Sequence, residues 1–153
     1  MEIGMVKEWI TKAGYRAKIF HNGYADSEWH CGYVEVPPGH PLYGLNYSDT
    51  MPNGVFLSID TPVGKRGIIP LVCGVDFDKP RIDVFFDVHG GITYDGSMGK
   101  PGTWWFGFDC NHLHDNIGFC DEVYVMAECE SLAEQLKTVQ ENAQIKSPDA
   151  GDE

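Results

Sequence analysis

The sequence predicts an α+β fold, in which a mostly antiparallel, twisted β-sheet is packed against a helix near each end of the chain. Three observations lead to this prediction. Short alternating or apolar segments, bounded by glycine and proline, recur along most of the chain. One long segment near the C-terminus has apolar residues at helical spacing. The length of 153 residues suits a single domain with one hydrophobic core.

Residues 2–12 predict a short amphipathic helix that ends near Gly14. Its apolar residues recur at helical spacing: Ile3, Val6, Trp9 and Ile10. Residues 15–20 alternate between apolar and basic side chains, which is typical of a strand, and Asn22-Gly23 is a turn signal. Residues 29–36 predict the next strand, which Pro37 ends because proline cannot donate to a sheet ladder.

The middle of the chain predicts a long loop followed by further strands. Residues 37–54 contain no periodic pattern, and we expect them to fold over apolar surface through Tyr43, Tyr47 and Met51. Residues 55–60 form a strand candidate. Residues 68–75 are apolar, but Pro70 makes them an edge strand or a covered loop.

Two apolar runs near the centre of the chain each end in polar residues. Residues 82–88 predict a strand that leads into His89-Gly90-Gly91. Residues 103–108 predict a second strand that leads into the polar segment 109–115, and residues 96–102 join the two as a hairpin-like connection. We therefore expect the polar ends of the two runs to lie close together.

Residues 123–140 predict the C-terminal helix, which should cover one face of the sheet. Its apolar stripe is Val125, Cys129, Leu132, Leu136 and Val139. Asp121 and Glu122 lie near its start, where the helix dipole favours negative charge. Residues 142–153 are polar and acidic, so we expect a globular domain over residues 1–141 and a disordered tail after it.

Charge and composition exclude several classes of partner. The formal net charge of −12 repels duplex nucleic acid and anionic membranes. Binding of a small anion remains compatible with this net charge. Charges farther away than a Debye length of about 8–10 Å are largely screened, so a few local donors can outweigh them. No apolar run approaches the roughly 20 residues of a membrane span, and no signal peptide is evident. We therefore expect a cytoplasmic protein.

The five cysteines are odd in number, widely spaced and without a CxxC pair. This pattern argues against a disulfide framework and against a structural zinc site made of cysteines, and it favours a reducing compartment. For Cys73 and Cys129 we expect buried apolar packing. Cys110 is a candidate nucleophile if His89 or His112 serves as its base, although no helix N-terminus is evidently aimed at its thiol.

The polar ends of the two central runs predict a pocket for a small polar or nucleotide-like ligand. Its candidate residues are His89, Gly90, Gly91, Tyr94, Trp105, Asp109 and His112. Gly90-Gly91 is either an anion-binding nest or a tight bend. Trp105 either packs in the core or forms the floor of the pocket, since Gly107 on the same side leaves room for a flat group.

The same region predicts a candidate metal site. Imidazole and carboxylate ligands suit a divalent metal such as zinc or manganese, and His89, Asp109 and His112 are the expected ligands. His114 and Asp115 follow closely in the sequence. The alternative is that these side chains cap turns and bind loop backbone. With a metal the protein is a candidate hydrolase; without one it is a binding protein or an interaction and scaffold module, and either form is a candidate homo-oligomer.

Three stretches carry a resemblance. Residues 31–44, residues 87–94 with the motif HGGITY, and residues 104–112 with the motif WWFGFDCNH together resemble a family of small uncharacterised proteins of bacteriophages, prophages and bacterial genomes. Members often have Gly-Asp after the last histidine, where this chain has Leu113-His114-Asp115. The resemblance implies an accessory role in the host cytoplasm, such as countering a host defence by sequestering a nucleotide signal.

Overall fold

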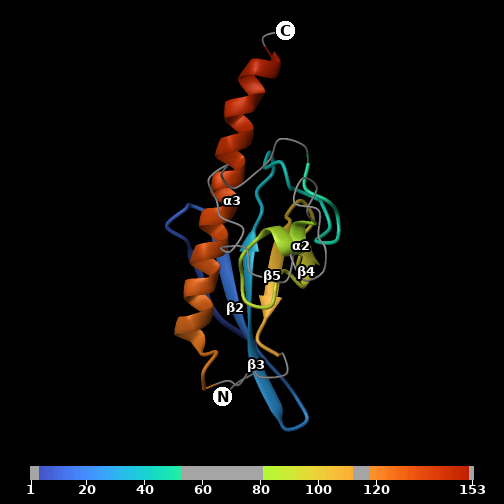
Figure 1. The fold of residues 1–153 in the computed structure, drawn as a ribbon. Helices are drawn as coiled ribbons and strands as arrows, with labels where there is room; N and C mark the ends of the chain where they lie inside the picture. Colours follow the sequence, from blue (N-terminus) through green and yellow to red (C-terminus); the bar gives the residue numbers. More distant parts are fainter. Residues whose placement is uncertain (1–3, 53–80, 112–117, 152–153) are drawn as a thin grey trace.

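The structure, a computed structural model, describes residues 4–52, 81–111 and 118–151, and the side chains of the last segment as far as residue 142. A five-stranded antiparallel sheet packs against one long helix (Figure 1). The strand order is β1-β2-β3-β5-β4. The strands are β1 (Gly4–Ile10), β2 (Arg16–Tyr24), β3 (Ser27–Glu35), β4 (Tyr94–Gly96) and β5 (Trp105–Asp109). The predicted α+β class and antiparallel sheet are thus confirmed.

The prediction of an N-terminal helix is wrong, because residues 4–10 form the edge strand β1. A β-bulge between Met5 and Lys7 shifts the register with β2. The extra residue interrupts the alternation expected of a strand and leaves apolar residues at a spacing that resembles a helix. Of these apolar residues, Trp9 packs against the core, and its Nε1 donates to Glu130 Oε2 at 2.8 Å.

The β2–β3 hairpin turns later than the sequence predicts. Asn22-Gly23, the expected turn, pairs with Trp29 and Glu28 inside the ladder. The turn falls at Ala25-Asp26, where Ala25 has a φ of 55°. Asn22 Nδ2 donates to Cys31 Sγ at 3.0 Å, which helps to hold this residue within the strand.

Residues 37–52 fold over the core, as expected for this loop. Leu42 and Met51 are buried in the same apolar cluster as the sheet residues. Backbone bonds join the loop to the next described segment, since Tyr47 O accepts from Asp83 N–H at 2.9 Å. The predicted strands at residues 55–60 and 68–75 lie outside the described residues.

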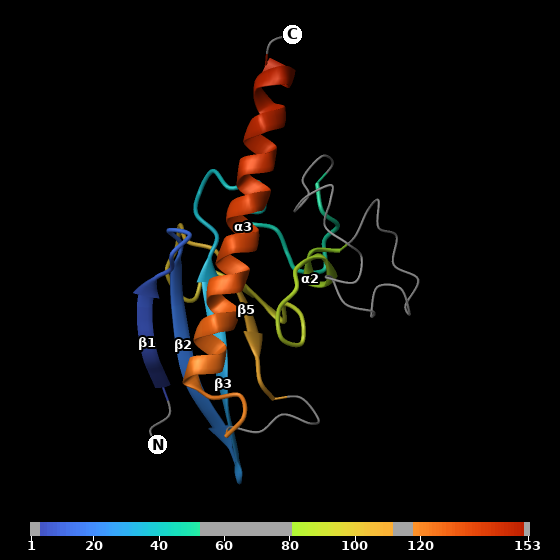
Figure 2. The same cartoon turned by 60° about the vertical axis from the view of Figure 1, so that its left-hand side comes forward.

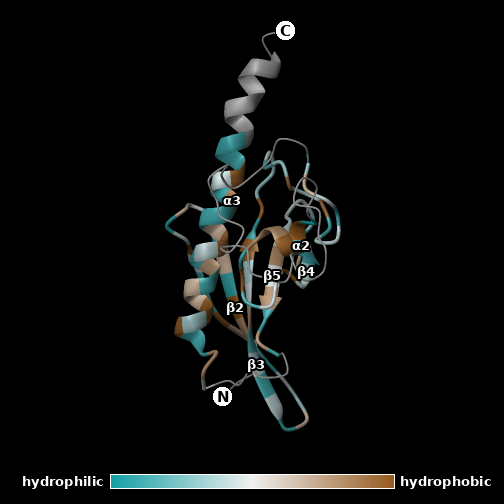
Figure 3. Ribbon diagram, viewed as in Figure 1, coloured by the Kyte–Doolittle hydropathy of each residue, from teal (hydrophilic) through white to brown (hydrophobic). Residues whose placement is uncertain are grey.

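The strand expected at residues 82–88 is instead the single helical turn α2 (Ile82–Phe85) followed by irregular chain. Ile82 and Phe85 are three positions apart and both face the core. α2 is coloured as hydrophobic in Figure 3. A short apolar run does not distinguish a buried strand from a buried helical turn, which explains the wrong prediction.

The long helix α3 spans Glu122–Gly151. Asp121 precedes it, and its Oδ1 accepts from Tyr124 N–H at 2.9 Å, so the predicted acidic start is a capping contact. All five residues of the predicted apolar stripe are fully buried. The helix continues through residues 142–151, which the sequence predicts to be part of a disordered tail.

The sheet has two different faces, because side chains alternate along each strand. α3 lies across one of them, against β2 and β3 (Figure 2). We call this the helix face; it carries Ala17, Ile19, Val34, Phe106 and Phe108. The opposite face, the outer face, carries Arg16, Lys18, Tyr33, Glu35 and Trp105.

Two glycines of the sheet make room for neighbouring side chains. A Cβ on Gly32 would lie 2.7 Å from Cys129 Sγ of α3, so glycine is needed where the helix crosses β3. On the outer face, a Cβ on Gly107 would lie 2.4 Å from Cδ1 of Tyr33. The room that the sequence predicts beside Trp105 is therefore filled by a ring of the protein itself.

Candidate functional site

Three potential metal ligands meet on the helix face. One ligand atom each from His89, Cys110 and Cys120 lies within 4.8 Å of the other two. His89 precedes the Gly90-Gly91 turn, Cys110 follows β5, and Cys120 precedes α3. We call this group the His-Cys-Cys cluster. It joins three segments that are separate in sequence.

β5 fixes the direction of the Cys110 side chain. Cys110 N–H donates to His30 O at 3.0 Å, which continues the β3–β5 ladder past the last strand residue. Because side chains alternate, Cys110 faces the helix side and Asp109 faces the outer side. The Cys110 side chain is buried. This explains why Cys110 lies in the cluster with His89.

α3 orients His89 through two contacts. The backbone N–H of His89 donates to Glu128 Oε1 at 2.7 Å. Its Nδ1 lies 2.8 Å from the Tyr124 hydroxyl, and the two rings meet edge to face. Metal-binding histidines commonly have such a partner on the imidazole, because it fixes the ring orientation.

The backbone of Cys120 is held by a buried histidine. His30 Nδ1 lies 3.1 Å from Cys120 O, and since a carbonyl can only accept, this nitrogen carries the proton. Behind it, the His21 and His30 rings are 5.5 Å apart, and His21 Nε2 lies 2.6 Å from Glu28 Oε1. Glu28, His21 and His30 therefore form a polar row. It runs from the half-exposed Glu28 carboxylate to the backbone of the fully buried Cys120.

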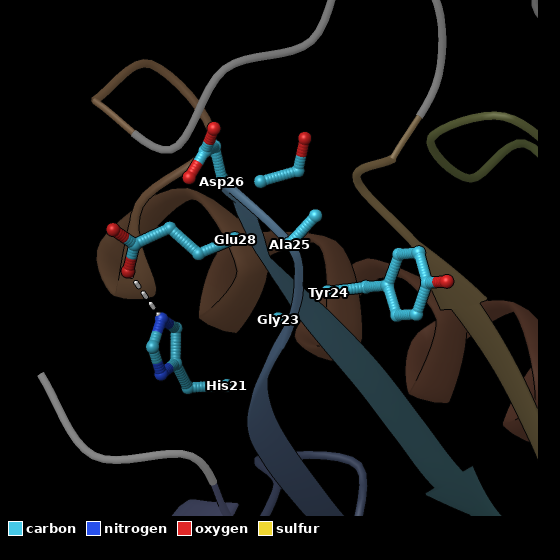
Figure 4. Close-up of a pocket in the computed structure, with 7 residues that line it drawn as sticks. His21, Gly23, Tyr24, Ala25, Asp26 and Glu28 are labelled. Carbon is cyan, nitrogen blue, oxygen red and sulfur yellow. Dashed lines mark hydrogen bonds and ion pairs between the residues drawn. The ribbon is translucent and has the colours of Figure 1, made fainter.

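Figure 4 shows the outer end of this row, with the His21 ring directed at the Glu28 carboxylate. A hollow of about 340 Å³ surrounds the hairpin tip there. Its lining is His21, Gly23, Tyr24, Ala25, Asp26, Ser27 and Glu28. The hollow lies at the surface and gives the buried row contact with solvent on the Glu28 side.

The ligand types and spacing of the cluster suit zinc. Thiolates and imidazole are zinc ligands, with Zn–S bonds of about 2.3 Å, so two thiolates on a tetrahedral ion lie about 3.8 Å apart. The observed separations of up to 4.8 Å exceed this by at most about 1 Å.

The structure divides the predicted pocket between two faces. His89 lies in the cluster on the helix face, while Tyr94, Trp105 and Asp109 belong to the outer face. Asp109 Oδ2 accepts from Thr93 Oγ1 at 3.1 Å, and Asp109 is not a member of the His-Cys-Cys cluster. The predicted His89–Asp109 pair and the metal set of His89, Asp109 and His112 stay predictions, and the structure adds a different group around His89. His112, His114 and Asp115 lie outside the described residues.

Gly90 and Gly91 serve a turn. Both have positive φ, 70° and 79°, and Gly91 N–H donates to Val88 O at 2.8 Å. A Cβ on Gly91 would come within 3.2 Å of Asp83 O. The tight bend, one of the two predicted alternatives, accounts for these glycines because it uses both their conformation and their lack of a side chain.

Sequence reasoning missed Cys120 and did not consider Cys110 as a metal ligand. It did pair His89 with Cys110 as a candidate base and nucleophile, and the structure places the two together. Cys110 and Cys120 lie outside any CxxC pattern, so their meeting depends on how the chain returns from β5 to α3. The sequence offers only one hint of this meeting, which is the position of each cysteine. Cys110 directly follows a strand, and Cys120 directly precedes the residue that caps a helix.

Trp105 lines a separate cavity of about 240 Å³ on the outer face. The indole is nearly buried, at 3% exposure, and Lys18 Nζ lies 4.8 Å from its ring centre. Trp105 is thus a buried residue that also lines a cavity, and this cavity is not lined by His89.

No family model, curated protein or solved structure matches this chain. The resemblance to phage and prophage proteins stays a prediction. Within the part of the chain that the structure describes, no helix combines the length and apolar character needed to cross a membrane.

Proposed function

We propose that this is a zinc-binding protein whose metal is held by His89, Cys110 and Cys120. The observation that carries the proposal is the convergence of two buried thiols and an imidazole within 4.8 Å. Buried thiols alone are common core residues, but an imidazole held in place by Tyr124 and directed to the same point adds a second, polar ligand type.

The ligand set selects among metals. Thiolates are soft ligands that favour zinc, whereas manganese prefers oxygen ligands. The sequence-based set contained Asp109 and left both metals open; replacing the carboxylate with two cysteines favours zinc. The ion would connect the turn at His89, the end of β5 and the start of α3, and its binding energy would contribute to folding.

A metal-dependent hydrolase is the second candidate function. The specific observation is Glu128, whose carboxylate lies 2.7 Å from the backbone nitrogen of His89. Catalytic zinc sites use three protein ligands and keep one position open, where the ion supplies an activated water. In this arrangement Glu128 is the nearby carboxylate with the chemistry to accept a proton.

Cobalt titration of the chelator-treated, untagged protein tests the zinc proposal. We expect one equivalent of cobalt to produce thiolate charge-transfer absorption, and zinc to abolish it by displacement. Cys110→Ser and Cys120→Ser should reduce or remove the absorption. Cys129→Ser is the matched control, because Cys129 is an equally buried thiol on α3 outside the cluster.

Folding of each variant is checked by circular dichroism. If the serine variants fail to fold, His89→Gln serves instead, because His89 is only half-buried and its loss creates less of a cavity. Absorption that is unchanged in His89→Gln and in the folded cysteine variants would contradict the proposal.

A further inference from the structure

The outer face of the sheet carries a polar cavity that the zinc proposal does not use. It lies where β1, β2 and β3 approach the turn between β4 and β5. Its lining is Glu8, Arg16, Lys18, Glu35, Ser97, Met98, Lys100, Thr103 and Trp105. We propose that this cavity binds a small phosphate-bearing molecule through Lys18 and Lys100.

Only some of the charged side chains that line the cavity have an ion-pair partner. Arg16 lies between both carboxylates, 3.7 Å from Glu8 and 3.8 Å from Glu35. Neither lysine forms an ion pair with any residue that the structure describes. Two ammonium groups are thus left for an external anion, in a chain whose net charge is −12.

The walls hold the lysines in position. Lys18 extends from β2 over the buried Trp105 ring, 4.8 Å from its centre, and this cation–π contact limits the motion of its ammonium group. Lys100 belongs to the opposing turn, where Thr103 Oγ1 donates to Lys100 O at 2.8 Å. The two lysines therefore line the cavity from a strand and from a turn whose backbone is braced.

The size of the cavity limits the ligand. Pockets for drug-sized ligands span about 300–1,000 Å³, and this cavity measures about 240 Å³. It suits inorganic phosphate or the phosphate group of a mononucleotide, with the remainder outside. A phosphate monoester carries about −1.5 to −2 charges at pH 7, which suits two lysine side chains.

Isothermal titration of the full-length protein as purified, at constant ionic strength, tests this inference. The probes are inorganic phosphate, adenosine monophosphate and chloride. We expect saturable binding of phosphate or of the monophosphate, and none of chloride. Tighter binding of the nucleotide would indicate contacts beyond the phosphate, whereas equal binding would indicate phosphate alone.

The variants Lys18→Gln and Lys100→Gln should each weaken binding about tenfold or more, as expected for the loss of a charged partner. Lys7→Gln is the matched control, since Lys7 also lies over a tryptophan, 5.9 Å from the ring of Trp9, but outside the cavity. Absence of binding, or equal weakening by all three variants, would overturn the proposal. Because the cavity shares no residue with the His-Cys-Cys cluster, failure here leaves the zinc proposal unaffected.

Discussion

The side chains of Asp109 and Cys110 point to opposite faces of the sheet, so these neighbours have different surroundings. The Asp109 carboxylate accepts from Thr93 on the outer face. The Cys110 thiol lies with His89 and Cys120 on the helix face. A one-residue difference in the sequence thus decides whether β5 presents a carboxylate or a thiol on the helix face, and under the zinc proposal the thiol is the softer ligand.

Removing the hydroxyl of Tyr124 should weaken zinc binding without unfolding the protein. The hydroxyl lies 2.8 Å from His89 Nδ1, and loss of such a partner typically costs about 10–100-fold in metal affinity. Tyr124→Phe keeps the edge-to-face ring contact. Competition with a chromophoric chelator measures the affinity, and Tyr24→Phe, on an 81% exposed tyrosine, is the control. Equal affinities in the two variants would show that the Tyr124 contact does not support the metal.

The unfolding free energy should fall on acidification because of His40. Its Nε2 bonds to Leu136 O at 2.8 Å, and its Nδ1 accepts from Leu42 N–H at 3.0 Å, so the folded protein holds a neutral imidazole. Burial lowers the pKa of His40 below its ordinary value of 6.5. The unfolded chain therefore binds more protons below about pH 6.5, and stability is lost as the pH falls through that value.

Chemical denaturation of the wild type and of His40→Gln between about pH 7 and pH 5 measures this effect. The wild type should lose stability relative to the variant as the pH decreases. A stability difference that does not change with pH would contradict the assignment of a neutral, buried His40.

Gly107→Ala should destabilise the fold by about 1–3 kcal/mol, the usual cost of overpacking. The new methyl group would lie 2.4 Å from the Tyr33 ring. Tyr33→Ala removes the clash, so the double variant should cost less than the sum of the single changes. Urea denaturation of the four proteins gives the coupling energy, and strictly additive losses would show that the ring moves aside freely.

Leu132→Ala should lower the unfolding free energy by about 2–5 kcal/mol, because it truncates a fully buried residue of α3. Leu132 is outside the cluster, so the zinc affinity of the folded fraction should equal that of the wild type. The two measurements separate a core residue from a site residue. A large loss of zinc affinity in folded Leu132→Ala would mean that the site depends on the packing of α3 as a whole.

The sequence predicted the elements that have a long, regular pattern. The apolar stripe of α3 and the alternation of β2 and β3 are each repeated often enough to identify the element. β1 and α2 were mistaken for a helix and a strand because a bulge and a one-turn length leave too few repeats. A local sequence pattern identifies a helix or a strand only when it repeats over more residues than such an irregularity disrupts.

The candidate site was partly predictable. His89 was identified as polar chemistry at the end of an apolar run, and the structure places it in the cluster. Cys110 was not considered as a ligand, because which side chains of β5 lie on the helix face depends on strand register. Cys120 meets Cys110 only after the chain returns to the start of α3, a tertiary relationship that no local motif encodes.

Elemental analysis of the untagged protein, purified without chelator, tests the central claim most directly. We predict about one zinc per chain in the wild type and in Cys129→Ser, and clearly less in Cys110→Ser, Cys120→Ser and His89→Gln. Zinc far below one equivalent in the wild type, with no uptake and no rise in melting temperature when zinc is added, would contradict the account.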